Sequence, residues 1–555
     1  MKNLVKTVLW LLLAASLLVS CTQSGSSSAN QATGKTVLNI AGDGEIPTAD
    51  STNTGNTISS GVLYYVQEGL VRLDPDGNPT PGVAESWEVD ETGTIYTFHL
   101  REDAYWENGV PVVADDFIFS WQRLADPTFA AVSANQLVLS GIVNSEAILA
   151  GELPVTDLGI AAPDEHTIVI TLVQPNTYFL KEVGSTIFYP LNREFVTGLG
   201  DLYATDAEKH LSNGPFTFEE WDGTGLSWSY VKNEYYWDKD SIYLTQINVE
   251  VIKDQGTKVS LYEAGELDSI SITGDYFAQY KDDPGLVQVP SLSASNVEIG
   301  IAHDQNNFEA TANGALVNVN IRKALFYAVD REELITYILE GQGTPAVGII
   351  ADGIANNPGT GASIGEDTGN QVYFDGDLAR EYWEKGLAEL GVTSITLELL
   401  TSDSDSAKKV GEYLQNQWQE ELPGLIIDYV PVVTSVRFER MMNFDFDLAL
   451  GGWSGGFDPL SYIEQHNITS AHNHSQYVNP VFNDLVAKIK SEGNDVQARW
   501  DDIIAAQQIL LDEAVEIPLY SGVSNILVAS NLHNVYFRSI GGVTVDYTYA
   551  YFSGE

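Results

Sequence analysis

A serine in a glycine-rich run is the first residue whose surroundings could support chemistry. Residues 452–456 read Gly-Trp-Ser-Gly-Gly and fit the pattern G-x-S-x-G, in which Ser454 would be a nucleophile on a sharp strand-to-helix turn. That turn requires a helix directly after the serine, whereas Gly455, Gly456 and Pro459 delay the helix, and no histidine is obviously placed as a base. A serine hydrolase is therefore a remote alternative, and we expect the protein not to be an enzyme.

Three histidines lie close together shortly after this run. His466, His472 and His474 have a spacing at which imidazoles could bind a metal, and Glu464 is near enough in sequence to be a further ligand. The same stretch is rich in asparagine and serine, which is more typical of a polar loop. We therefore predict no metal site and no cofactor.

The only cysteine, Cys21, follows a short apolar run. Lys2 and Lys6 precede that run, and Leu-Val-Ser stands directly before the cysteine. This pattern is typical of a bacterial lipoprotein, so we predict a signal peptide over residues 1–20 whose removal leaves Cys21 as the acylated N-terminus. The apolar run is shorter than the ~20 residues that a membrane-spanning helix needs. A single cysteine also excludes an intramolecular disulfide and a cysteine-based metal site.

The rest of the chain is acidic and long. Residues 21–35 are polar and predict a flexible tether. The formal charge is −50, from 77 acidic and 27 basic residues, which excludes nucleic acid as a partner because phosphate binding needs clustered Lys and Arg. We attribute the acidity to a well-solvated surface. Without its first 20 residues the chain still far exceeds the ~250 to 300 residues at which single cores stop growing, so we expect two or more lobes with clefts between them.

Short strands that alternate with amphipathic helices predict an α/β protein. The expected strands are 94–100, 167–173, 226–232 and 395–400. The expected helices are 319–339, 404–422, 480–489 and 496–511, and a loop rich in glycine and asparagine is expected over 351–370. Composition and periodicity alone predict an α/β protein and do not indicate its function.

One long stretch carries a family resemblance. Residues 67–127 read QEGLVRLDPDGNPTPGVAESWEVDETGTIYTFHLREDAYWENGVPVVADDFIFSWQRLADP and resemble the oligopeptide-binding proteins of bacterial ABC importers, which are extracellular solute-binding proteins of family 5, the peptide/nickel type. The resemblance continues in the same order through residues 213–216, 232–238, 262–268, 321–325, 330–331, 452–453 and 517–520. It covers essentially the whole chain after the predicted signal peptide.

The resemblance implies a periplasmic-binding-protein-like type II fold with two main lobes, a hinge and an extra inserted domain. Lobe I would comprise residues 36–80, 206–305 and 516–555, the inserted domain residues 81–205, and lobe III residues 306–515. The implied function is to capture a short peptide in the interlobe cleft and deliver it to the permease subunits of an ABC transporter. The protein would be a monomer, exported and anchored by its lipid to the outer face of the cytoplasmic membrane, or in the periplasm if an outer membrane is present.

The resemblance also implies the ligand-binding residues. A segment directly before the first helix would hold the peptide backbone, and its match here is Thr57, Ile58, Ser59 and Ser60. Trp453, Ser454 and Tyr520 would also contact ligand. These are the residues that the family pattern places around a bound peptide.

The family's acid for the ligand ammonium is the main departure. Relatives carry it three residues after the tryptophan, where this chain has Gly456, and Asp458 is the nearest replacement. Asp458 could equally cap a helix beginning at Pro459.

The carboxylate anchor is also unassigned. Leu450 or Met441 occupies the expected arginine positions, which leaves Arg437 and Arg440 as candidates. The scaffold therefore leaves other ligands open: a nickel chelate, haem, an oligosaccharide or a signalling peptide.

Overall fold

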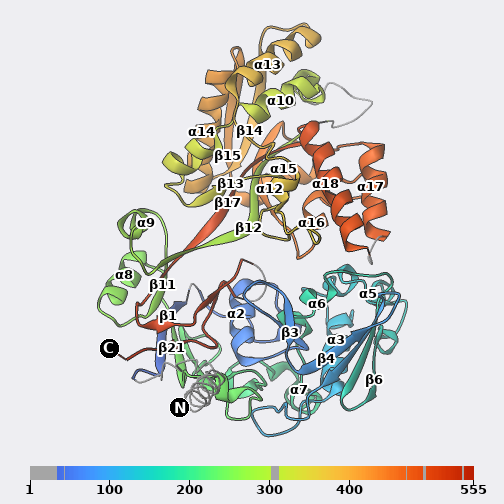
Figure 1. The fold of residues 1–555 in the computed structure, drawn as a ribbon, viewed down its shortest axis with the longest axis vertical. Helices are drawn as coiled ribbons and strands as arrows, with labels where there is room; N and C mark the ends of the chain where they lie inside the picture. The colour runs from blue at the N-terminus through green and yellow to red at the C-terminus, as the bar shows by residue number, and fades with distance from the viewer. Residues whose placement is uncertain are drawn as a thin grey trace, which may run out of the picture.

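The computed structural model describes residues 34–42, 44–301, 312–470, 472–491, 495–539 and 543–554. The predicted signal peptide, most of the predicted tether and the lipidation residue Cys21 lie outside these ranges. Within the described residues, no helix combines the length and the apolar character needed to cross a bilayer. Figure 1 shows an upper body and a lower body with a thin connection between them.

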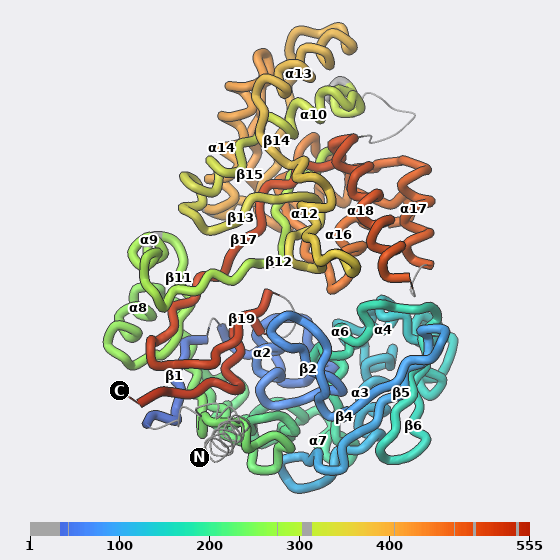
Figure 2. Tube along the Cα trace, in the orientation of Figure 1, coloured from blue at the N-terminus to red at the C-terminus, as the bar shows by residue number. Residues whose placement is uncertain are grey.

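Two long antiparallel strands make this connection, as the trace in Figure 2 shows. They are β12 (Leu286–Ile299) and β17 (Glu516–Val528), which pair along most of their length. Their register shifts between Pro290 and Ala294 and again between Ser295 and Asn296. Such irregularities interrupt the hydrogen-bond ladder and bend a strand pair locally. The connection is therefore not a continuous regular ladder.

Both strands belong to one mixed sheet that extends through the two bodies. The strand order is β15-β14-β16-β12-β17-β11-β1-β10-β9-β8, and β13 pairs with β17. The other strands are β1 (Val37–Gly42), β8 (Phe216–Glu219), β9 (Ser227–Lys232), β10 (Gln246–Val251), β11 (Ser269–Ile272), β13 (Gly343–Pro345), β14 (Ile395–Ser402), β15 (Leu425–Val432) and β16 (Leu448–Ser454).

A separate antiparallel sheet forms the right-hand part of the lower body in Figure 1. Its order is β4-β5-β7-β6, and alternate residues of β5 and β7 are buried under helices, as expected of a sheet with one covered face. We call this sheet and its helices, residues 84–199, the side unit. Its elements are β4 (Ala84–Val89), β5 (Ile95–Leu100), β6 (Ile160–Asp164), β7 (Thr167–Thr171), α3 (Ala114–Ala125), α4 (Gln136–Leu139), α5 (Ser145–Leu149), α6 (Phe179–Glu182) and α7 (Arg193–Leu199).

The left-hand part of the lower body is built from distant chain segments. Its apolar cluster joins residues between 38 and 66, between 191 and 289, and between 526 and 552. The further elements of the lower body are α2 (Thr57–Val66), α8 (Gln255–Glu263), α9 (Asp275–Tyr280) and the short strands β2 (Val71–Leu73), β3 (Pro79–Pro81), β18 (Leu532–His533), β19 (Tyr536–Phe537), β20 (Val545–Asp546) and β21 (Tyr551–Phe552).

The upper body packs helices on both sides of β14, β15 and β16. Its apolar cluster runs from residue 292 to residue 519 and contains the fully buried indoles of Trp383 and Trp418. Its helices are α10 (Val319–Tyr327), α11 (Arg331–Glu333), α12 (Ile364–Asp367), α13 (Gly376–Leu390), α14 (Asp405–Glu421), α15 (Thr434–Met442), α16 (Leu460–Ile463), α17 (Pro480–Ser491) and α18 (Val496–Asp512).

Most predicted elements are confirmed, with ends displaced by one or two residues. The prediction of one continuous helix over 319–339 is wrong, because α10 ends at Tyr327 and Asp330 starts a new turn by accepting a hydrogen bond from the Glu333 amide at 2.9 Å. The predicted loop 351–370 contains the short helix α12. The side unit, the remainder of the lower body and the upper body have separate apolar clusters, while the predicted lobe boundaries stay a prediction.

Candidate ligand-binding cleft

A cavity of about 780 Å³ lies where the start of α2, the side unit and the turn after β16 meet. Figure 1 shows α2 and α6 below α16 across this junction. The cavity therefore has walls from both bodies. Its lining residues are Thr54, Gly55, Asn56, Thr57, Ser60, Ser133, Asn135, Gln136, Leu139, Glu182, Ser185, Thr186, Ile187, Gly456 and Phe457.

The lower wall begins with an extended segment that ends at a helix cap. Thr54 and Asn56 have extended backbone angles, and the Asn56 side chain accepts a hydrogen bond from the Ser59 amide at 2.9 Å. Asparagine is a favoured N-cap because it satisfies an amide that has no partner within the helix. The helix therefore starts at Thr57, earlier than we expected.

The predicted backbone-binding segment needs a correction of its position. Thr57, Ile58, Ser59 and Ser60 form the first turn of α2, so they do not present an extended edge to a ligand. The segment that is extended and directly precedes the helix is 54–56, and it lines the cavity. The asparagine that caps the helix was the sequence signal for this boundary.

The side chains of these four residues point in different directions. Thr57 and Ser60 line the cavity, and the Ser60 hydroxyl lies 3.3 Å from that of Thr186. Ser59 is fully buried, and Ile58 lines a separate cavity of about 360 Å³ in the lower body. Thr57 and Ser60 are therefore the members of the predicted set that face the junction.

The upper wall is the turn that follows β16. Trp453 is partly buried, and its indole N–H donates to the Ser461 carbonyl at 2.8 Å. Ser454 ends β16 and is exposed, while Gly456 and Phe457 line the cavity. Trp453 therefore stabilises the turn through this hydrogen bond. Gly456 is the predicted site residue on this upper wall that lines the cavity.

Asp458 is held by partners within the upper body. Its carboxylate forms two hydrogen bonds with the Arg499 guanidinium, one of them at 3.0 Å, and accepts a third from the Leu460 amide at 2.9 Å. Asp458 thus binds the first amide of α16, but the helix begins at Leu460 with Pro459 as its N-cap, so the predicted capping of a helix that begins at Pro459 needs a correction by one residue. The negative charge of Asp458 is neutralised by Arg499.

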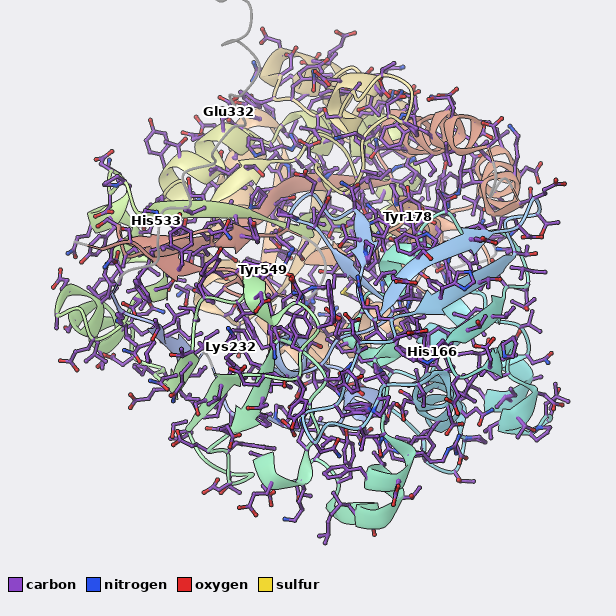
Figure 3. The ribbon with its side chains drawn as sticks, turned by 60° about the horizontal axis from the view of Figure 1, so that its bottom comes forward. His166, Tyr178, Lys232, Glu332, His533 and Tyr549 are labelled. Carbon is purple, nitrogen blue, oxygen red and sulfur yellow. The ribbon has the colours of Figure 1, made fainter. Side chains whose placement is uncertain are left out.

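Arg499 also contacts the side unit. Its guanidinium carbon lies 5.6 Å from the ring centre of Tyr178, the residue directly before α6. Figure 3 labels Tyr178 beside the helices of the upper body. Burial raises the pKa of the Tyr178 hydroxyl, followed in effect by the nearby charge of Asp458, so this phenol is neutral. The contact therefore joins the two bodies.

Glu182, at the end of α6, is the acid that faces the cavity. Its carboxylate accepts a hydrogen bond from the Asn176 side chain at 3.1 Å. Burial raises the pKa of Glu182 to about 7, against the opposing effect of hydrogen bonds from Ser140 and Asn176. No motif in the sequence singled out Glu182, Tyr178 or Arg499, because their neighbourhood arises from the packing of distant segments.

The remaining predicted site residues lie away from the cavity. Tyr520 is partly buried in β17 opposite Ser295, and burial raises the pKa of its hydroxyl. Arg437 donates to the Leu450 carbonyl at 2.8 Å, and Arg440 pairs with two acids at the surface. Neither arginine lines the cavity.

The three histidines considered as metal ligands each contact a different residue. His466 lies 3.1 Å from Glu516, and His474 lies 3.0 Å from Glu298. His472 instead packs edge-on against Trp453. Among the described residues, no group of three or more His, Cys, Asp or Glu side chains could hold a metal ion.

Comparisons with known proteins agree on one family. The model of bacterial extracellular solute-binding proteins, family 5, matches residues 78–473. The periplasmic oligopeptide-binding protein OppA of Salmonella typhimurium is 31% identical over 87% of each chain.

Solved structures extend this match to the whole described fold. Listeria monocytogenes OppA bound to peptide is 33% identical, covers 94% of this chain and 100% of its own, and superposes with a TM-score of 0.71. The substrate-binding domain of an oligopeptide ABC transporter from Bacillus anthracis is 32% identical, covers 94% and 99%, and has a TM-score of 0.72.

Proposed function

Because the chain belongs to the bacterial extracellular solute-binding proteins of family 5, with their α/β fold, we propose that it captures short peptides in the 780 Å³ cavity for an ABC importer. The relatives named above are an oligopeptide-binding protein, an OppA with bound peptide and the substrate-binding domain of an oligopeptide transporter. The proposed role is binding and delivery to the permease subunits, without catalysis.

The observation that carries the proposal is the cavity wall formed by residues 54–56. Thr54 and Asn56 are extended, and their carbonyl groups already accept from the Ser133 hydroxyl and the Ser60 amide. The backbone amides of this segment are therefore the groups that a peptide backbone of any sequence could pair with. The remaining lining is mostly small and polar, which suits side chains of varied size when water fills the unused space. We therefore expect weak side-chain selectivity.

Three further parts of the proposal concern the whole molecule. The upper body would close over the lower body by bending of β12 and β17, which connect them. The protein would be exported and held at the membrane by a lipid on Cys21. Its lobes would follow the boundaries predicted from the sequence, and it would act as a monomer.

The test is to denature freshly purified protein and identify the released small molecules by mass spectrometry. A set of short peptides supports the proposal and gives their length directly. Release of a metal chelate, haem or a sugar instead would contradict peptide capture. If nothing is released, calorimetry with a mixture of tripeptides to pentapeptides decides the question, and no heat of binding contradicts the proposal. A protein refolded from denaturant in the absence of peptides is the matched control.

A further inference from the structure

Glu182 is the acidic residue in the lining of the cavity. Of the lining residues, Glu182 is the one with an ionisable side chain at neutral pH, and the others are neutral. Among the residues that the structure describes, no Lys or Arg side chain lines the cavity. An occupant therefore meets one acidic side chain and, among the described residues, no basic one.

The charged group that acts on Glu182 from outside the lining is itself paired. Asp458 and Arg499 form a two-point ion pair, and Tyr178 beside them is neutral. Asp458 is the charged group that acts on Glu182, and it disfavours ionisation of that carboxyl group. Neither member of this pair is free to meet a ligand charge without losing its present partner.

Glu182 is held in place but has no counter-ion. Asn176 donates to its carboxylate at 3.1 Å, and Asn176 is itself fixed because its side-chain oxygen accepts from the Tyr178 amide at 2.9 Å. Within the described part of the chain, Glu182 forms no ion pair with Lys, Arg or His. A carboxylate that is partly removed from water and lacks a counter-ion gains most from a bound cation.

Within the described ranges, the opposite wall supplies no competing acid. Gly456 faces the same cavity without a side chain, and a Cβ atom added there would meet no atom within 4 Å. There is open space between this glycine and the rest of the wall, so an ammonium group can approach Glu182 from the cavity.

We propose that Glu182 binds the ammonium group of the ligand, so that the cavity selects peptides with a free amino terminus and does not require a free carboxyl terminus. This rests on the proposed peptide-binding function and deepens it. The ammonium donates hydrogen bonds to the Glu182 carboxylate, and the peptide backbone then runs from the side unit toward residues 54–56. The carboxyl terminus meets no cation in the cavity wall, so its removal as an amide leaves binding unchanged.

The test compares matched peptides on matched variants. A synthetic mixture of tripeptides to pentapeptides without lysine is prepared with free amino termini, with acetylated amino termini and with amidated carboxyl termini. Binding is measured by competition, with mass spectrometry of the retained peptides. Glu182→Gln is compared with Glu107→Gln, because burial also raises the pKa of Glu107 to about 7 but Glu107 lies outside the cavity.

The wild-type protein should retain free-amine peptides at least tenfold better than acetylated ones, since a hydrogen bond to a charged group is worth ~10- to 100-fold in affinity. Glu182→Gln should abolish this preference and leave acetylated peptides within about twofold of wild type. Glu107→Gln should behave as wild type. Amidated peptides should bind as well as peptides with free carboxyl termini.

Two outcomes would overturn the inference while leaving the proposed function intact. One is that Glu182→Gln lowers the affinity for free-amine and acetylated peptides equally, which would mean that Glu182 stabilises the end of α6 and does not bind the ammonium group. The other is that the preference for free amines survives the substitution. If the wild-type protein retains no peptide of any kind, the proposed function fails and this inference fails with it.

Discussion

The Arg499 guanidinium carbon lies 5.6 Å from the centre of the Tyr178 ring, and this contact links the upper body to the side unit. The planar cation faces an aromatic ring whose hydroxyl stays neutral. Such a pair is worth ~0.5 to 2 kcal/mol when partly removed from water. Because each member belongs to a different body, that energy favours the arrangement in which the bodies approach each other.

Replacing Tyr178 by leucine removes this contact and should therefore allow the two bodies to move apart. We expect the radius of gyration of ligand-free protein in small-angle scattering to increase and peptide affinity to fall by ~2- to 10-fold. Tyr337→Leu is the control, because this upper-body tyrosine is 73% exposed. Equal scattering curves and equal affinities for the Tyr178 variant and the control would show that the contact does not hold the bodies together.

Asp458→Asn should reduce stability without changing the preference for free-amine peptides. The substitution leaves Arg499, whose side chain is 9% exposed, without its counter-ion. Since the Asp458 side chain is 26% exposed and water can partly replace it, we expect a loss of about 1 to 2 kcal/mol in the free energy of unfolding. Asp445→Asn, which breaks a surface pair with Arg440, should cost less. A selective loss of free-amine peptides in the Asp458 variant would instead make Asp458 the ammonium-binding residue.

The sequence predicted the class of elements well and the cavity wall only in part. Strands and amphipathic helices follow from local periodicity, so the helix with Val410, Leu414 and Trp418 on one face was predictable. The local signal for the break after Tyr327 is Asp330, which caps the turn that follows.

The rest of the site depends on long-range packing. Glu182 and Gly456 are far apart in the chain, and they share a cavity because β12 and β17 place the upper body over the side unit. Arg499 lies in α18, whose sequence contains no recognisable motif. It pairs with Asp458, directly before α16, because α16 and α18 pack against each other. No periodicity or spacing encodes such a relationship.

The ligand-free protein should be more stable at pH 5 than at pH 8. Burial raises the pKa of Glu107 to about 7 and the pKa of Asp116 to about 6, from ordinary values near 4. The folded state therefore holds protons that the unfolded state releases between about pH 4 and pH 7, so stability is lost as the pH rises through that window. Thermal unfolding across this range measures the effect. Glu107→Gln should make the pH dependence shallower, and an unchanged slope would contradict the prediction.

Placing an aspartate at Gly456 should restore ammonium binding to the Glu182→Gln variant. The backbone there is outside the left-handed region, and an added Cβ atom meets nothing within 4 Å, so the side chain fits without displacing its neighbours. Its carboxylate would enter the same cavity from the opposite wall. We expect the double variant to recover ~10-fold of the lost preference for free over acetylated peptides, measured by the same competition.

The control is Gly456→Asn in the same background, which has nearly the same shape but no charge and should recover nothing. Recovery by both substitutions would mean that the added side chain acts by filling space. Recovery by neither would mean that an acid on the upper wall cannot reach the ammonium group, because the amino terminus lies too far toward α6. Restoration by aspartate alone would show that the cavity requires one negative charge and accepts it from either body, which is how a chain with glycine at position 456 can still hold an amino terminus.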